Sequence, residues 1–217
     1  HWGFDIVAQS DDRVLVDATS FFLRDARGIA DQIAARNQGT FTLDRSRSAI
    51  HLPATRAFPE NIEVEATLTF TSSDPGFLVR SVAASGGAIT LRQHHSFIAL
   101  PDNAYETRVA DPRVGVQGPT IADYGTAIDE DLRVRWVARH RLERTDPIAE
   151  RSAAVDPIVY YVDPGTPEPV RSALIEGARW WNTAFEAAGF IDGFQVEVLP
   201  DGIDSQDVRY NMIHWTH

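Results

Sequence analysis

A single apolar stripe between residues 170 and 188 constrains the fold more than any other feature of this sequence. Its members recur every three or four positions, as on one face of an α-helix: Val170, Leu174, Ala178, Trp181, Phe185 and Ala188. Gly189 follows the stripe and predicts a left-handed helix end. The pattern predicts a helix of about six turns that begins after Thr166 as N-cap and buries Trp181 in a core, with Trp180 packed against a neighbouring layer.

Strand-like runs stand on both sides of this helix. Residues 158–165, "IVYYVDPG", form a nearly continuous apolar run that Pro164 and Gly165 end. Residues 194–200, "FQVEVLP", alternate between apolar and polar, and residues 208–215, "VRYNMIHW", are rich in β-branched and aromatic side chains. Residues 158–217 are therefore predicted to run strand, helix, strand, strand.

The last of these strands bears on a possible metal site, because His214 and His217 stand three positions apart at its end. On a strand, an odd separation puts two side chains on opposite faces, about 10 Å apart along the chain. We expect that these two histidines do not hold one metal ion together.

Residues 1–145 are predicted to form a β-rich accessory domain with one helix. Two short apolar runs around "QSDD" predict a hairpin, and Ser20, as N-cap, begins a predicted helix over 21–36. The run "IEVEATLTFTS" alternates between apolar and other residues. Its apolar side chains are predicted to share one face of a strand: Ile62, Val64, Ala66, Leu68 and Phe70. Further strands are predicted at 39–44, 48–53, 76–83, 88–100 and 132–142. Residues 146–157, polar and alanine-rich, are predicted to be a linker to the domain over 158–217.

Composition limits the classes of partner. The net charge is -11, and all 20 basic residues are arginine, which disfavours nucleic acid and anionic membrane surfaces. No apolar run reaches the roughly 18–20 residues needed to span a bilayer. The chain has no cysteine, which removes disulfides, thiolate metal ligands and cysteine nucleophiles.

Adjacent His94 and His95 are the polar pair that stands out in the β-rich region. On a strand they point to opposite faces, so they do not chelate one metal together. One of them, or His217, is a candidate to face a cleft of a larger protein. The alternative is a structural histidine that is hydrogen-bonded within the sheet.

Longer strings in both parts resemble one protein family. "PIVYYVDPGTPEPVRSALIEGARWWNTAFEAAGF" and "FQVEVLPDGIDSQDVRYNMIHWTH" look like the start of the catalytic domain of large bacterial zinc-dependent metalloproteases of the metzincin-like type. "VLVDATSFFLRDARGIA", "TFTLDRSRSAI" and "LRQHHSFIALPD" resemble the amino-terminal domain of unknown function that precedes the peptidase in these proteins. The resemblance covers nearly the whole chain and implies an α+β fold, in which a β-rich domain precedes the strand–helix–strand–strand start of a peptidase domain.

The chemistry that the resemblance implies belongs to a longer protein of which this chain would be one part, here called the parent protein. Such enzymes are usually exported, and they hydrolyse peptide bonds with a water that zinc activates, using an H-E-x-x-H helix. This motif is absent from the sequence, so no catalytic or metal-binding residue is carried over and no cofactor is expected in these 217 residues. We interpret the chain as an internal fragment that lacks both ends and a signal peptide, whose partners are the rest of its polypeptide and, in the parent, a peptide or protein substrate. The alternatives are a non-catalytic binding module and a prodomain-like regulatory domain.

Overall fold

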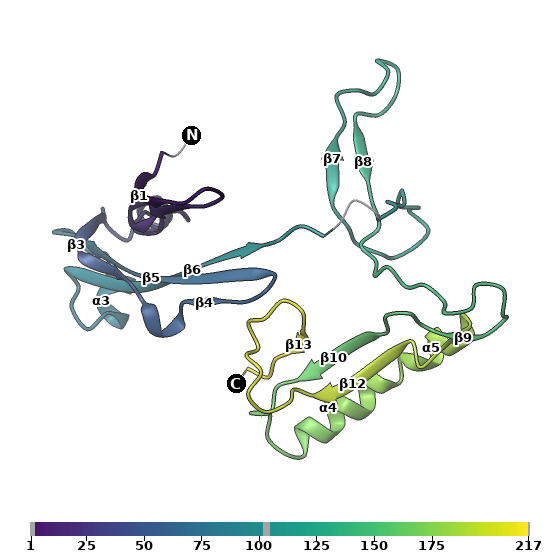
Figure 1. The fold of residues 1–217 in the computed structure, drawn as a ribbon. Helices are drawn as coiled ribbons and strands as arrows, with labels where there is room; N and C mark the ends of the chain where they lie inside the picture. Colours follow the sequence, from purple (N-terminus) through teal and green to yellow (C-terminus); the bar gives the residue numbers. More distant parts are fainter. Residues whose placement is uncertain (1–2, 102–104, 217) are drawn as a thin grey trace. The chain divides into compact units, whose positions relative to one another are not determined.

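The computed structural model describes residues 3–101 and 105–216. They form two compact units that divide between Ala99 and Leu100. Both units combine strands with short helices, and strands dominate (Figure 1), so the predicted β-rich mixture is confirmed. No helix in the described ranges is both long and apolar enough to cross a membrane.

Unit 1 is built on a sheet whose central strand is β5 (Asn61–Thr71). On one side β5 pairs antiparallel with β3 (Thr42–Ile50) and β4 (Arg56–Ala57), which a short 3-10 turn, η1 (Leu52–Ala54), connects. On its other side β5 pairs antiparallel with β6 (Ala88–Ile98) along its whole length. The 39–44 and 48–53 runs, predicted as two strands, contribute mainly to the single strand β3, which bulges between Asp44 and Ala49.

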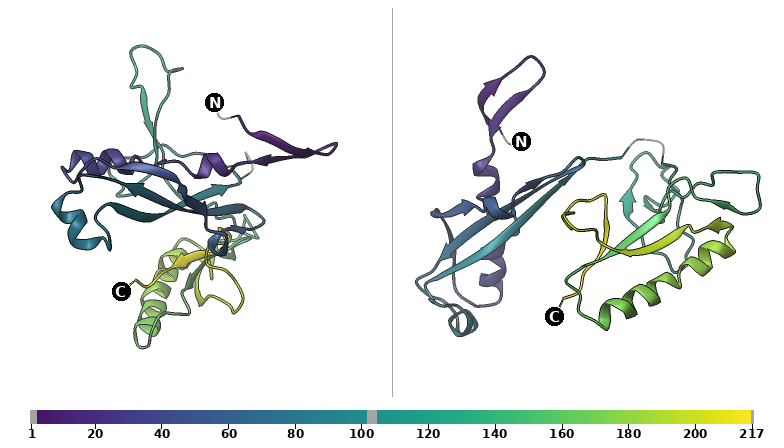
Figure 2. Two further views of the ribbon diagram at one scale, coloured as in Figure 1. Left: turned by 90° about the vertical axis from the view of Figure 1, so that its left-hand side faces the viewer. Right: turned by 60° about the horizontal axis from the view of Figure 1, so that its bottom comes forward.

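The alternation along β5 creates the core of unit 1. Ala66, Leu68 and Phe70 are fully buried and Val64 nearly so, which confirms the predicted apolar face. Ile62, predicted on the same face, is 49% exposed. Two helical segments, over residues 19–22 and 29–35, lie along this face of the sheet (Figure 2).

The helix predicted over 21–36 is two helices, α1 (Thr19–Phe22) and α2 (Ile29–Ala35). Asp25 explains the break, because its carboxylate accepts hydrogen bonds from the main-chain N–H groups of Ile29 and Ala30 at 2.8 and 2.9 Å and so caps the second helix. The predicted N-cap, Ser20, lies inside α1. Asp17 instead accepts the N–H of Thr19.

Two other local predictions in unit 1 had opposite outcomes. The predicted hairpin is confirmed, since β1 (Asp5–Gln9) pairs antiparallel with β2 (Val14–Asp17). The strand predicted over 76–83 is wrong, because this segment contains helix α3 (Phe77–Val82). Gln38 binds the start of α3, where its side-chain oxygen accepts the N–H of Leu78 at 2.8 Å, and a short apolar run does not by itself distinguish strand from helix.

Unit 2 contains a small hairpin and a parallel sheet. Strands β7 (Thr120–Ala122) and β8 (Arg133–Arg135) pair antiparallel, so the strand predicted over 132–142 is much shorter than expected. In the parallel sheet, β10 (Ile158–Val162) lies between β12 (Phe194–Val198) and β13 (Asn211–Ile213). Within this sheet the predicted order of strand, helix, strand and strand is the observed one, but the last strand, predicted over 208–215, covers only residues 211–213. The last strand ends before His214, and His217 lies outside the described residues.

The helix after β10 is also shorter and divided. It consists of α4 (Val170–Arg179) and α5 (Asn182–Ala187), with Trp180 and Trp181 between them. Thr166 does not cap it, since its hydroxyl is buried and has no hydrogen-bond partner among the residues that the structure describes. Gly189 follows α5 with a φ of 89°, which confirms the predicted left-handed end.

Residues 146–157, predicted to be a linker, are attached to unit 2. Strand β9 (Ser152–Ala153) pairs in parallel with β11 (Phe190–Ile191), and Ser152 is buried. Just before this segment, the guanidinium of Arg144 donates a hydrogen bond to the main-chain oxygen of Ala188 at 2.8 Å. These contacts fasten the segment to the end of the helix.

Candidate functional site

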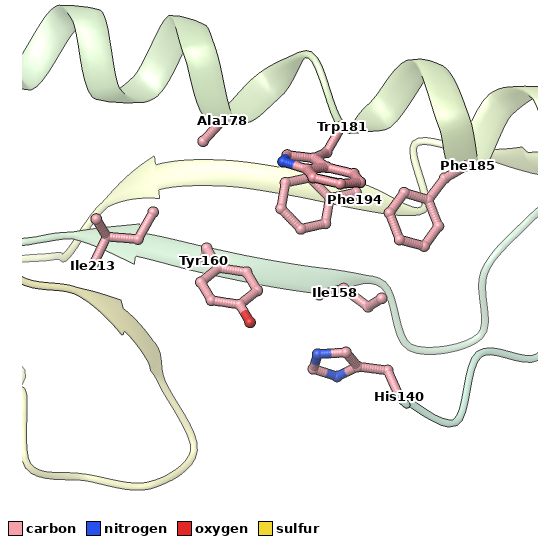
Figure 3. A pocket seen from close by; sticks show the side chains of 8 residues that line it. All are labelled: His140, Ile158, Tyr160, Ala178, Trp181, Phe185, Phe194 and Ile213. Carbon is pink, nitrogen blue, oxygen red and sulfur yellow. The ribbon is translucent and has the colours of Figure 1, made fainter. Parts of the chain in front are cut away.

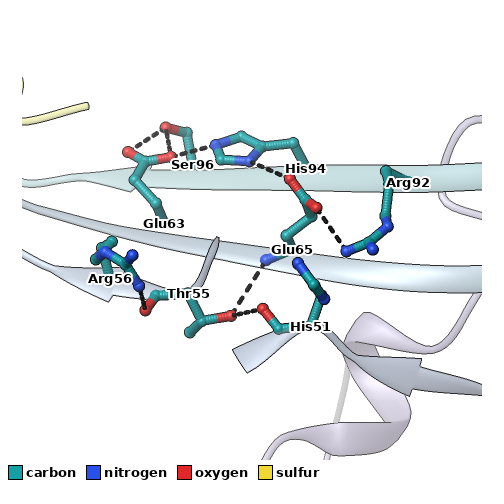
Figure 4. A network of polar contacts seen from close by, with 8 residues as sticks. All are labelled: His51, Thr55, Arg56, Glu63, Glu65, Arg92, His94 and Ser96. Carbon is teal, nitrogen blue, oxygen red and sulfur yellow. Dashed lines mark hydrogen bonds and ion pairs between the residues drawn. The ribbon is translucent and has the colours of Figure 1, made fainter. Parts of the chain in front are cut away.

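A polar cluster on the sheet of unit 1 contains the predicted candidate His94 (Figure 4). The carboxylate of Glu63 lies at its centre and accepts hydrogen bonds from three side chains. Ser96 donates at 2.5 Å, Asn61 donates from its amide nitrogen at 2.5 Å, and His94 lies with Nε2 at 2.6 Å. Glu65 lies beside this group and pairs with Arg92 at 3.0 Å.

Strand register explains why these residues meet. Glu63 is opposite Ser96, and Glu65 is opposite His94, in the antiparallel pairing of β5 with β6. Side chains two positions apart share a face of a strand, so all of these polar groups project on the face opposite the apolar core. The second nitrogen of His94, Nδ1, lies 3.9 Å from Glu65.

Glu63 is ionised in this setting. Its side chain is only 5% exposed, and burial by itself raises its pKa. The hydrogen bonds from Ser96, Asn61 and His94 outweigh this effect, so the pKa of Glu63 lies below the usual value of 4.5. Because an ionised carboxylate only accepts hydrogen bonds, Nε2 of His94 carries the hydrogen that lies between the two residues.

His95 points to the opposite face of β6, as predicted for adjacent strand residues. Its ring lies 5.3 Å from the ring of Phe22. Nε2 of His95 lies 2.8 Å from the amide nitrogen of Gln93, which also donates to the main-chain oxygen of Arg24 at 3.0 Å. The side-chain oxygen of Gln93 accepts the N–H of Ala26, which fixes the orientation of the amide.

This arrangement requires a neutral His95. Since Gln93 donates to Nε2 of His95, that nitrogen must be unprotonated and accept. Burial, followed by the influence of Arg24 and His94, lowers the pKa of His95 from the usual value of 6.5. His95 is thus a packed ring that receives a hydrogen bond on its polar edge.

The cluster does not have the order of a nucleophilic triad. In such a triad a histidine lies between the hydroxyl and the carboxylate and takes the hydroxyl proton. Here Glu63 lies between Ser96 and His94, so its carboxylate holds both of them. Among residues 3–101 and 105–216, no group of three or more histidine, aspartate or glutamate side chains is arranged to hold a metal ion. The geometry is that of a charge-assisted structural network, which joins β5 to β6.

Unit 2 contains an apolar pocket between its helices and its sheet (Figure 3). The cavity measures about 330 Å³, and aromatic rings form most of its wall. The rings of Phe185 and Phe194 are stacked with centroids 5.5 Å apart, and Tyr160 lies 5.6 Å from Phe194. Its other lining residues are His140, Ile158, Ala178, Trp181 and Ile213. This volume is in the range of pockets that accept a side chain or a small ligand.

The two tryptophans between α4 and α5 are more exposed than predicted. Trp181, predicted in the core, is 64% exposed at the pocket, and Trp180, predicted to be packed, is 73% exposed. The helical stripe does place Trp181 on the sheet side, as Figure 3 shows. The stripe does not reveal how much of the sheet face remains uncovered.

Sequence reasoning missed Glu63, the residue on which the polar cluster depends. The available signal was the alternation of Asn61, Glu63 and Glu65 on the polar face of a strand whose other face is strongly apolar. A carboxylate in the middle of such a strand needs donors from its neighbours. Which neighbours supply them depends on strand register, and the sequence does not specify it.

Comparison with known families gives one match. The model of a family described as "Domain of unknown function (DUF5117)" matches residues 1–145. The matched region includes all of unit 1 and the first part of unit 2, among them β7, β8 and His140. No curated protein and no solved structure matches the chain.

Proposed function

The chain belongs to the DUF5117 family through residues 1–145, and on this premise we propose that it is the non-catalytic front part of an exported zinc-dependent metalloendopeptidase. In this proposal residues 158–217 are the strand–helix–strand–strand start of a metzincin-like peptidase domain. Zinc binding and peptide hydrolysis then belong to polypeptide that follows these residues in the parent protein. Peptide or protein chains are the proposed substrates.

The observation that carries the proposal is the half-covered sheet of unit 2. Helix α4 lies mainly against β12, and less against β10. On the same face, Tyr160 and Ile213 border the open aromatic pocket, and Trp181 is largely exposed beside them. A sheet face of this composition is stable when a second helix or another layer covers it. The resemblance to metzincin-like metalloproteases implies such an element, because a zinc-binding helix follows this unit in those enzymes.

The chemistry assigned to that helix is simple. Two histidines one turn apart bind the metal, and the adjacent glutamate activates the metal-bound water for attack on a peptide carbonyl. The role of residues 158–213 would be to supply the sheet on which this helix packs. His94, His95 and His217, the candidates for facing a cleft, receive no catalytic role in this proposal.

A hydrolysis assay tests the proposal. The 217-residue chain and the longer product of its gene are each incubated with fluorescently labelled casein, with and without a zinc chelator. We expect chelator-sensitive cleavage by the longer product and none by the 217-residue chain. The matched control is His94→Ala in the longer product, which should cleave as the unchanged protein does. Cleavage by the 217-residue chain, or a gene product that ends at residue 217, would contradict the proposal.

A binding or prodomain-like regulatory role for unit 1 is a second candidate. The observation that favours it is an 11-residue outer strand, β6, one edge of which pairs with no other strand in the part of the chain that the structure describes. Cutting the chain between Ala99 and Leu100, where the two units divide, tests the regulatory form of this role. If unit 1 inhibits the peptidase, the cut should raise the activity of the longer product. Unchanged activity would exclude this inhibitory role.

A further inference from the structure

Strand β6 of unit 1 offers a long main-chain edge. It runs from Ala88 to Ile98 and pairs with β5 through eleven register positions. Within the described residues no strand pairs with its other side. Exposed strand edges of this length are uncommon, because their unpaired N–H and C=O groups bind other extended chains.

The hydrogen-bond pattern identifies which groups face outward. Ser72 donates to the main-chain oxygen of Gly87 at 3.0 Å, and Ala99 donates to that of Glu60 at 2.7 Å. These bonds mark both ends of the ladder, and in an antiparallel pair the bonded positions recur every second residue. The odd-numbered residues of β6 therefore bond to β5. The N–H and C=O groups of the even-numbered residues point away from it. At the start of the strand the N–H of Ala88 donates to Ser85, and the other even-numbered residues are Thr90, Arg92, His94, Ser96 and Ile98.

These five outward residues are all exposed. Their main-chain N–H groups donate no hydrogen bond to the main chain of another described residue. A charged side chain such as that of Arg92 would normally protect such an edge. Here Arg92 pairs with Glu65 at 3.0 Å and His94 pairs with Glu63 at 2.6 Å. Both side chains are thus held over β5, and the charge of Arg92 is partly neutralised by Glu65. The edge also contains no proline.

The two faces beside the edge differ in character. On one face, Arg92, His94 and Ser96 form a polar row. On the other face, the ring of Phe97 is 45% exposed and lies 5.9 Å from the ring of Phe22 and 6.1 Å from that of Phe21. A strand added here would place alternate side chains beside the polar row and beside the aromatic rings.

We propose that the outward edge of β6 binds an extended polypeptide segment as an additional strand, with polar side chains alternating with large apolar ones. Main-chain hydrogen bonds from the even-numbered residues supply affinity, and the aromatic rings around Phe97 select the apolar positions. A second copy of the chain is the less suitable occupant. A symmetric antiparallel pair of two copies centred on Arg92 would place that cationic side chain against its own copy, which is unfavourable.

The test uses a defined probe, the blocked and dye-labelled peptide Thr-Phe-Gln-Val-Gln-Phe-Thr, and the intact chain. Fluorescence anisotropy measures binding. In parallel, NMR hydrogen exchange measures the protection of individual main-chain amides. In the free protein, amides of Leu91, Gln93 and His95 should exchange slowly, and those of Arg92 and His94 should exchange fast. Adding the peptide should protect the second group.

Two matched variants separate the main chain from the side chain. Arg92→Pro removes the side chain and one outward N–H, whereas Arg92→Ala removes the side chain alone, and proline is tolerated on the open side of an edge strand. One lost main-chain hydrogen bond predicts about tenfold weaker binding by Arg92→Pro than by Arg92→Ala. Circular dichroism checks that both variants are folded.

Several results would overturn the proposal. They are absence of binding, equal binding by the two folded variants, and protection that appears away from the even-numbered amides. Slow exchange of the even-numbered amides in the free protein, together with a dimer by sedimentation, would show instead that a second copy occupies the edge. If Arg92→Pro does not fold, the exchange measurement on the unchanged chain decides the question.

Discussion

Replacing Glu63 by glutamine tests whether the buried carboxylate holds β5 and β6 together. The change keeps the size of the side chain but leaves one accepting oxygen where the carboxylate has two. Three donors, from Asn61, His94 and Ser96, converge on this carboxylate. His94 and Ser96 are partly exposed and can turn to water, whereas Asn61 is only 3% exposed. A hydrogen bond to a charged group contributes about 1.5–3 kcal/mol, so we expect Glu63→Gln to lower the free energy of unfolding by about 2 kcal/mol.

The neighbouring carboxylate provides the matched control. Glu65 lies on the same strand and face, but its side chain is 21% exposed and its partner Arg92 is 48% exposed. An ion pair of this kind contributes at most about 1 kcal/mol. For a unit of roughly 100 residues, the difference corresponds to a melting temperature about 4–8 °C lower for Glu63→Gln than for Glu65→Gln. Differential scanning calorimetry measures both. Equal melting temperatures for the two variants would refute the structural role of Glu63.

Further predictions concern pH, core packing and one close backbone approach. Since the pKa of His95 is lower in the folded chain than the usual 6.5, the unfolded chain binds the proton more readily. The stability that His95 contributes is therefore present above about pH 6.5 and is lost as the pH falls through the pKa of His95 in the folded chain. His95→Phe should remove this part of the pH dependence of the melting temperature. An unchanged dependence of the melting temperature on pH would contradict this prediction. Leu68→Ala, at a fully buried position, should lower the free energy of unfolding, measured in urea, by about 3 kcal/mol. Ile62→Ala, at a position that is 49% exposed, should lower it clearly less. Similar losses for the two variants would show that the core is misassigned. A Cβ on Gly118 would lie 1.9 Å from the main-chain oxygen of Trp136, whereas one on Gly115 meets nothing within 4 Å. Gly118→Ala should therefore lower the melting temperature of unit 2 and Gly115→Ala should not, and the reverse order would rule out this contact.

Features with a local period were predictable from the sequence. The alternation along β5 predicted one apolar face from Ile62 to Phe70, and the structure buries every member of it except Ile62. Gly189 was predicted to end the helix and has the left-handed φ that this requires. Such patterns depend only on the geometry of one element, which is why they can be read from one sequence.

Features that depend on contacts between distant segments were not predictable. The segment predicted as a strand over 76–83 is a helix whose start is bound by Gln38, 40 positions away in the chain. Glu63 meets His94 and Ser96 across 31 and 33 positions of the chain. The exposure of Trp181 was missed for a related reason, because an apolar stripe specifies the face of a helix but not the extent of the layer that covers it.

The zinc content of the longer gene product tests the central claim most directly. Mass spectrometric metal analysis after exhaustive dialysis would be made on that product and, side by side, on the 217-residue chain. The account predicts about one zinc per chain in the longer product, as in enzymes with three protein ligands and a water, and no retained zinc in the 217-residue chain. A longer product without zinc would contradict it. So would stoichiometric zinc in the 217-residue chain that is lost when His94 or His217 is replaced.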